Sequence, residues 1–142
     1  MTDPTDIAEI AAEAVKTAGI LESDRIHVDL LPDTRVKRTS LLITETQAEY
    51  EDSFASSDEY GTYKSTLQFT VVSADPAKAK RLCREAAETA IRYFEIRIQP
   101  YKGPVHFVQR LGKENGMANS TGYEGMFASQ RTILVIHQFE PI

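Results

Sequence analysis

The hydrophobic pattern changes its period between residues 62 and 94, and this change constrains the fold more than any other feature of the sequence. In TYKSTLQFTVVS (62–73), apolar and aromatic residues alternate with polar ones, which predicts a half-buried strand. Asp75 and Pro76 then supply a capping side chain and a proline at the first helical position. Apolar residues recur at helical spacing after this start, and several are small: Ala79, Leu82, Cys83, Ala86, Ala90, Ile91 and Phe94. A strand followed at once by such a helix predicts a helix packed closely on a sheet.

The remaining segments extend this pattern to both ends of the chain. Residues 7–18 have helical periodicity between Asp6, a capping residue, and Gly19, which ends the helix. Alternating or short apolar runs over 26–30, 40–46, 105–111 and 126–139 predict strands, the last of them long or bent. The glycine- and asparagine-rich residues 112–125 predict a fourteen-residue loop. We therefore expect an α+β fold, with a mainly antiparallel sheet of four to five strands, two helices packed on one face and the order α-β-β-β-α-β-β.

Length and composition indicate one globular domain over 1–142. A chain of this length buries roughly 68–70% of the surface that its unfolded form exposes, and 42% hydrophobic with 26% charged residues is too apolar for a disordered chain. The acidic N-terminus lacks the features of an export signal, and the longest strongly apolar run covers only 133–136. We expect a soluble, non-exported chain that does not enter membranes.

One short segment carries the formal net charge of the whole chain. The sequence holds 16 basic and 21 acidic side chains, which gives −5. Residues 48–61 contain five carboxylates and no lysine or arginine. The acids are Glu49, Glu51, Asp52, Asp58 and Glu59, and Tyr50, Phe54 and Tyr60 lie among them. We predict a projecting acidic arm at about 47–61, because an extended segment of this length reaches roughly 20 Å out and back.

The aromatic residues are the reason for considering docking of this arm, since such residues are enriched at interfaces. Arg35, Lys37 and Arg38, together with the basic side of the helix after Asp75, offer a surface of opposite sign. Contact between different patches on identical copies closes as a ring when the rotation allows. We hypothesise that the arm docks on the next copy or lines the opening of a ring. A solvated loop and a calcium site remain alternatives, although calcium loops need a central glycine that this segment lacks.

The polar loop from Lys113 to Tyr123 completes the predicted interface. No residue is predicted to be catalytic, to bind a cofactor or to ligate a metal, because the phosphate-binding, hydrolase and metal-site motifs are absent from the sequence. His27, His106 and His137 lie on separate predicted strands, and Cys83 lies on the apolar face of a helix, which is typical of a buried core residue. The acidic balance argues against a protein that grips nucleic acid. An enzyme using His106 or Cys83 remains an alternative, and it would need a closed pocket with a perturbed titratable group.

The order of these segments resembles a known family. A capped N-terminal helix, a strand ending in DLLPD, a variable insertion, LQFTVVSADPAKAKRLCREAAETAI and the terminal GYEGMFASQRTILVIHQF are similar to the tail terminator proteins of long-tailed bacteriophages, also described as tail completion or minor capsid proteins. The resemblance lies in order and character over nearly the whole chain. In that family, a strand of aromatic and β-branched residues leads through a short turn into an alanine-rich helix, as residues 71–90 do here.

This resemblance implies a structural virion protein and not an enzyme. Family members assemble, usually as a hexameric ring, on the head-proximal end of a finished tail tube, where they end tube polymerisation and provide the head–tail joining surface. The implied partners are other copies of the chain, the tail tube protein and a head-completion or connector protein, with no cofactor. DNA passes through the channel without specific binding, and an acidic lumen would favour this by repelling phosphate. The implied location is the virion tail, and the host cytoplasm during assembly. A neck or head-completion connector protein of the same particle is the alternative.

Overall fold

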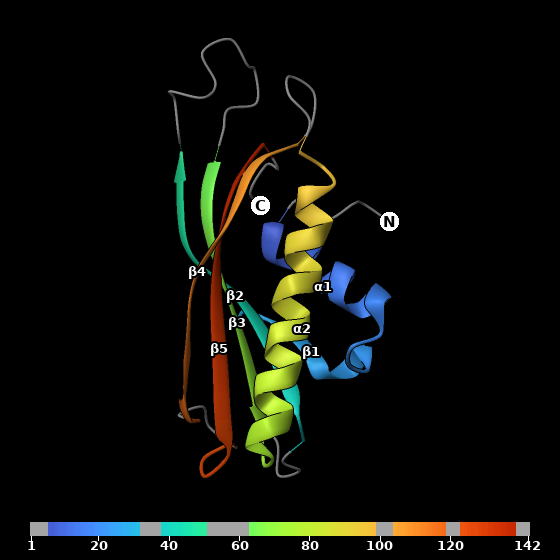
Figure 1. The fold of residues 1–142 in the computed structure, drawn as a ribbon, viewed down its shortest axis with the longest axis vertical. Helices are drawn as coiled ribbons and strands as arrows, with labels where there is room; N and C mark the ends of the chain where they lie inside the picture. Colours follow the sequence, from blue (N-terminus) through green and yellow to red (C-terminus); the bar gives the residue numbers. More distant parts are fainter. Residues whose placement is uncertain (1–5, 32–37, 51–62, 99–103, 119–122, 139–142) are drawn as a thin grey trace.

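A computed structural model describes residues 6–31, 38–50, 63–98, 104–118 and 123–138 of the chain. The elements follow the order α1 (Ile7–Ala18), the 3₁₀ turn η1 (Ser23–Arg25), β1 (Ile26–Val28), β2 (Ser40–Tyr50), β3 (Tyr63–Ser73), α2 (Pro76–Glu95), β4 (Val105–Met117) and β5 (Phe127–His137). This is the predicted α+β fold in the predicted order. Figure 1 shows both helices on the same side of the sheet.

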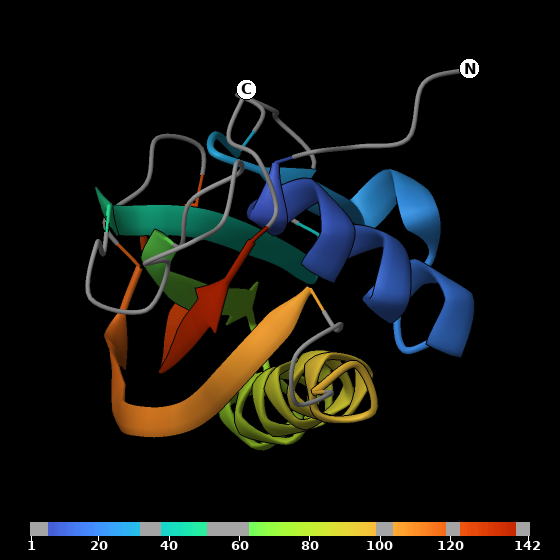
Figure 2. The same ribbon diagram turned by 90° about the horizontal axis from the view of Figure 1, so that it is seen from above.

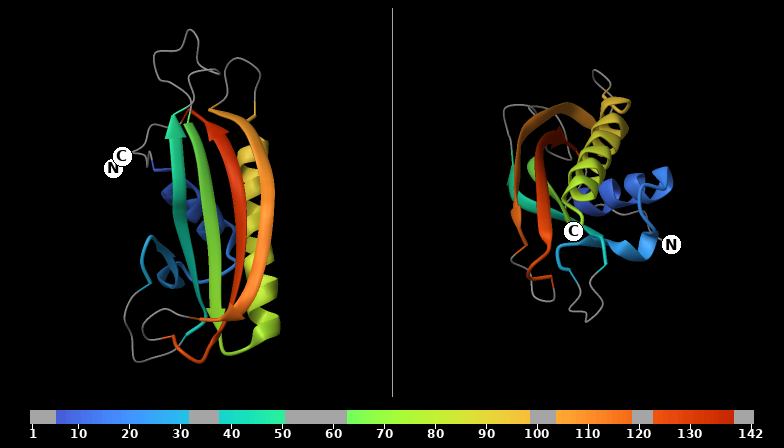
Figure 3. Two further views of the ribbon diagram at one scale, coloured as in Figure 1. Left: turned by 90° about the vertical axis from the view of Figure 1, so that its left-hand side faces the viewer. Right: turned by 60° about the horizontal axis from the view of Figure 1, so that its bottom comes forward.

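The sheet has five strands in the spatial order β1-β2-β3-β5-β4. β1 runs parallel to β2, and the other neighbouring pairs are antiparallel. The left view of Figure 3 shows β2, β3, β5 and β4 side by side, with α2 behind them. β1 is shorter than the predicted strand over 26–30, because Asp29 adopts a left-handed conformation with φ 70° that turns the chain away.

Both helices begin where the sequence predicts, and α1 also ends at the predicted Gly19. The Asp6 carboxylate accepts a hydrogen bond from the Ala8 amide at 2.8 Å, and Gly19 ends α1 in the left-handed conformation at φ 71°. At α2, the Asp75 carboxylate accepts hydrogen bonds from the amides of Ala77 and Lys78. These caps satisfy amide groups that have no partner within the helix.

The main core lies between the helices and the sheet. The small residues of α2 are buried and contact β3 and β5, which allows the helix to lie close to the strands. Phe69 of β3 and Phe94 of α2 are fully buried there. A second cluster, which includes Val72 and Tyr123, lies on the opposite face near the connection from β4 to β5. The two clusters sandwich the sheet at one of its ends.

The prediction of a fourteen-residue loop over 112–125 is wrong in its first half. β4 continues to Met117 and pairs with β5 along its whole length, with register shifts between Val105 and Phe107 and between Arg110 and Gly112. Glycine and asparagine have low strand propensity, but the hydrogen bonds offered by β5 outweigh it. Ser129 of β5 also donates to the side-chain oxygen of Asn115 at 2.7 Å.

The two faces of the sheet differ in character. The face away from the helices carries neutral polar side chains in its middle, and Gln68 donates to Gln130 across β3 and β5 at 2.9 Å. On the helical side, β4 curves around toward α2 (Figure 2). This curvature places β4, the edge strand of the sheet, beside α2.

Candidate interaction groove

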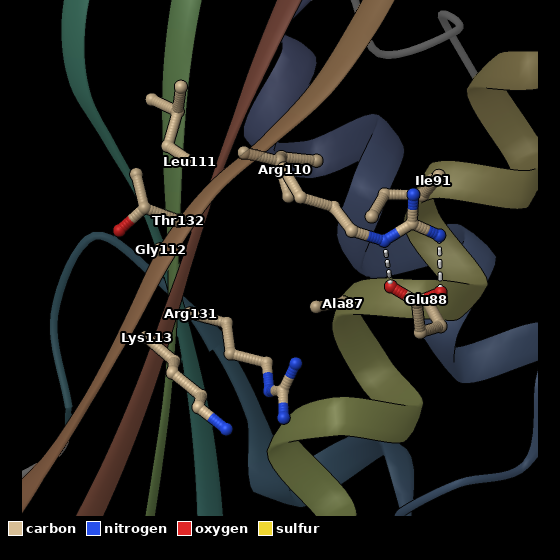
Figure 4. Close-up of a pocket in the computed structure, with 10 residues that line it drawn as sticks. Ala87, Glu88, Ile91, Arg110, Leu111, Gly112, Lys113, Arg131 and Thr132 are labelled. Carbon is tan, nitrogen blue, oxygen red and sulfur yellow. Dashed lines mark hydrogen bonds and ion pairs between the residues drawn. The ribbon is translucent and has the colours of Figure 1, made fainter.

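A groove lies between α2 and the strands β4 and β5. It contains two cavities, which share Lys113 and Arg131 in their linings. The larger has a volume of about 370 Å³ and lies along the N-terminal half of α2. The smaller has a volume of about 260 Å³ and lies further along the helix, where Glu88 and Ile91 line it (Figure 4).

Five cationic side chains line the larger cavity, and we call this set the basic groove. α2 contributes Lys80, Arg81 and Arg84, which lie toward one side of the helix because Arg84 follows Lys80 by four residues and Arg81 by three. The strands contribute Lys113 and Arg131, which are direct partners in the register of β4 and β5. Among the described residues that line this cavity, there is no carboxylate. Figure 4 shows Lys113 and Arg131 pointing together toward α2.

A neighbouring ion pair connects β4 to α2. The Arg110 guanidinium donates from Nε to Glu88 Oε2 at 2.7 Å and from Nη2 to Glu88 Oε1 at 2.5 Å, as the dashed lines in Figure 4 mark. This two-point contact lowers the pKa of the Glu88 carboxyl and raises the pKa of Arg110. Glu88 is therefore ionised and paired mainly with Arg110, while Arg131 of the basic groove also lowers its pKa through a weaker charge interaction.

The basic groove carries an excess of positive charge. Within the described ranges, ion pairs join Glu13 to Lys16, Glu22 to Arg25 and Glu88 to Arg110, and none involves the five cations of the groove. The Lys80 ammonium lies 5.5 Å from the centre of the Phe127 ring, a contact that favours the cation without cancelling its charge. An excess of positive charge is therefore held in a hollow of a chain whose net charge is −5.

The predicted acidic arm falls mostly outside the described residues. Glu49 is exposed on β2, and its carboxylate accepts a hydrogen bond from Gln47 at 2.8 Å. Tyr50 is the last residue of β2, where its backbone is paired with that of Tyr63. Thus residues 47–50 belong to a strand, whereas Glu51, Asp52, Phe54, Asp58, Glu59 and Tyr60 lie outside the described residues. Their role at an interface stays a prediction.

The predicted basic residues are divided in the same way. Arg35 and Lys37 lie outside the described residues, and Arg38 is exposed just before β2. Lys113 lies on β4 in the basic groove and not in a loop. Tyr123 is only 1% exposed and packs in the second core cluster, so its side chain serves folding of the isolated chain.

Sequence reasoning did not identify Arg131 and Arg110 as site residues. Arg131 appears in the sequence as one polar position of an alternating strand, and only the β4–β5 register places it opposite Lys113. The sequence did indicate a basic surface, because Lys80, Arg81 and Arg84 lie on the polar side of the helix. It did not indicate the strand that completes the groove, because the composition of residues 112–117 is typical of a loop.

The cysteine and the three histidines, which were the candidate catalytic groups, lie on α2 and on three different strands. Burial raises the pKa of the Cys83 thiol to about 11, and the thiol donates a hydrogen bond to the Phe69 carbonyl at 3.3 Å. His137 is buried, and its Nε2 lies 2.8 Å from the Ser65 hydroxyl. His106 lies on β4 and His27 on β1. The described part of the chain contains no group of three or more residues of the kinds that ligate metals.

Comparison with known proteins relates this fold to one solved structure in particular. The chain is similar to the sheath/tube terminator of an extracellular contractile injection system, PVC, determined by cryo-EM in the extended state, with a TM-score of 0.50 and 13% sequence identity. The match covers 100% of this chain and 61% of the terminator chain, so this chain spans about three fifths of that length. No family model and no curated protein matches the sequence. No helix among the described residues is both long enough and apolar enough to cross a membrane. The likeness shows a tail-terminator-like fold.

Proposed function

We propose that this chain is a structural component of a phage-type tail, where it ends the tail tube. In this proposal, copies form a ring, of six subunits by the family resemblance, at the head-proximal end of the finished tube. The ring stops further addition of tube subunits and offers its other side to a head-completion or connector protein. DNA passes through the opening without specific binding.

The observation that carries this proposal is the shared fold with a sheath/tube terminator over the whole of this chain. Two features of the chain support a structural role. The candidate nucleophile Cys83 is buried as a neutral thiol on the sheet-facing side of α2. The larger cavity of the basic groove is lined by cations and neutral groups, with no acid–base pair among its described residues.

The proposal is tested by letting the tail tube protein of the same particle polymerise with and without this chain. We expect added chain to shorten the tubes in proportion to its concentration, with extra density at one end of each tube in negative-stain electron microscopy. Unchanged tube lengths and bare ends would contradict the proposal. Separate mixtures with tubes and with DNA-filled heads identify the alternative, since a terminator binds tubes first and a neck protein binds heads first.

A further inference from the structure

The basic groove has the properties of a binding site for an acidic peptide segment. Lys113 and Arg131 are placed directly opposite each other on neighbouring strands, an arrangement that destabilises a sheet when nothing lies between the charges. Lys80, Arg81 and Arg84 face the same hollow from the helix. Five cations converging without a carboxylate among the described lining residues would be stabilised by an anionic ligand.

The size and surroundings of the groove favour a peptide over nucleic acid. Its larger cavity has a volume of about 370 Å³ and lies between a helix and a strand, which suits side-chain carboxylates better than a duplex. A net charge of −5 repels a polyanion such as DNA at long range. The sequence holds a ligand of matching chemistry, because residues 47–61 carry five carboxylates and no cation.

The same chain is poorly placed to fill its own groove with this segment. Tyr63 is paired with His137 at one end of the sheet, whereas Phe69 is paired with Arg131, six residues further along β3. The groove thus begins about 20 Å along the strands from Tyr63. The acids of the segment lie at most five residues from Tyr50 or Tyr63 in the sequence, so their backbone extends no more than about 17 Å from these strand ends, and Glu49 is held on β2 beyond reach. A second copy is not limited in this way, and we take it as the donor.

We propose that the basic groove, formed by α2 with β4 and β5, binds the acidic segment 47–61 of a neighbouring copy. This inference rests on the self-association in the proposed function and assigns the acceptor surface for it. The donor and acceptor are different patches on one chain, so each copy gives one segment and receives another. Such a contact is heterologous, and it closes as a ring when the rotation between copies permits.

The test uses a fluorescently labelled peptide with the sequence of residues 47–61, titrated with the full chain at low ionic strength. We expect saturable binding, measured by fluorescence anisotropy, and a loss of at least about tenfold in affinity for the double variant Arg84→Glu, Lys113→Glu. Both side chains are exposed, so the variant retains its fold by circular dichroism. The matched control is Lys78→Glu, the same charge change at an exposed residue of α2 that lines neither cavity, and it retains binding.

A neutral peptide makes the test specific. A peptide in which the five acids are replaced by their amides, asparagine and glutamine, keeps the size and the aromatic residues of the segment and should not bind the natural chain. Absence of peptide binding, or equal binding by the double variant and the natural chain, would overturn the assignment. Tighter binding of duplex DNA than of the peptide at equal ionic strength would also overturn it, because the groove would then be a phosphate site.

The tube assay separates this inference from the proposed function. If the peptide binds as expected while the chain leaves tube lengths unchanged, the acceptor assignment stands and the terminator role is wrong. If the double variant shortens tubes as the natural chain does and no peptide binds, the terminator role stands and the acceptor assignment is wrong.

Discussion

Ser65 lies between two titratable groups in the interior of the protein. It is 1% exposed, and its hydroxyl lies 2.8 Å from His137 Nε2. On β2, the Glu45 carboxyl also interacts with Ser65. This arrangement is not a catalytic triad, because the carboxyl contacts the hydroxyl and not the imidazole. The interactions of Ser65 instead affect the stability of the folded chain.

Glu45 makes folding depend on pH in a defined direction. Burial raises the pKa of its carboxyl above 4.5, with further contributions from Asp6 and Asp29, while the Ser65 contact opposes the rise. The folded chain therefore holds this proton more tightly than the unfolded chain does. The stabilising effect is present in full below the unfolded pKa and is lost as the pH rises through the folded pKa.

Glu45→Gln should accordingly raise the melting temperature at pH 7 by about 1–3 °C, a modest gain because partial exposure screens the penalty. At pH 3.5 the gain should vanish, since the natural side chain is then protonated as well. Thermal melts followed by circular dichroism at both pH values measure this difference, with the exposed Glu49→Gln on the same strand as control. An equal gain at both pH values would show that charge is not the cause.

Cys83 should be chemically inert in the native protein. Its thiol is fully buried, and a pKa of about 11 leaves about one thiol in a thousand ionised at pH 8. We expect iodoacetamide to label the cysteine at least about a hundredfold faster in 8 M urea than in buffer, as measured by mass spectrometry over time. Fast labelling of the native chain would mean that α2 separates from the sheet in solution and exposes Cys83.

At the scale of elements, α2 depends on its first turn. The Asp75 carboxylate accepts from the amides of Ala77 at 3.0 Å and Lys78 at 3.4 Å, and Pro76 follows it at the first helical position. Asp75→Ala should lower the free energy of unfolding by about 1 kcal/mol, measured by urea denaturation. Asp75→Asn keeps an acceptor oxygen and should lose less. Equal losses for the two variants would indicate that the charge near the helix dipole, and not the hydrogen bonds, is the stabilising feature.

The elements that sequence predicts well are those in which one signal dominates. The alternation of β3 and the capped periodicity of α1 and α2 reflect burial on one face, and the structure has these elements within one or two residues of their predicted bounds. The prediction for residues 112–117 was wrong because Gly112, Asn115 and Gly116 have low strand propensity, which indicates a loop. These residues form a strand only because they pair with β5. The pairing of one strand with another cannot be recognised from the residue pattern of a single segment.

The candidate site shows the same limit at the scale of the whole molecule. The basic character of Lys80, Arg81 and Arg84 was visible from helical spacing. Their convergence with Lys113 and Arg131 depends on the curvature of β4 toward α2 and on its register with β5, which only the folded chain provides (Figure 2). The net charge of −5 therefore gives no indication that the basic groove is positively charged.

This separation of charge predicts how the proposed assembly responds to salt. The screening length is about 10 Å at 0.1 M ionic strength and about 3 Å at 1 M, so contacts between unlike charges weaken strongly over this range. Sedimentation velocity of the full chain should show smaller species in sodium chloride at 1 M than at 0.05 M. An apolar interface would respond differently to the anion, because sulfate strengthens the burial of apolar surface.

Sodium sulfate at the same ionic strength therefore separates the two kinds of contact. Screening is matched, and sulfate also competes for lysine and arginine side chains, so a charge-dependent assembly should dissociate at least as far as in chloride. An assembly held by exposed apolar residues of the sheet edge, such as Leu111 and Met117, should instead grow in sulfate. Growth in sulfate would contradict association through the basic groove, since only an apolar contact gains from that salt.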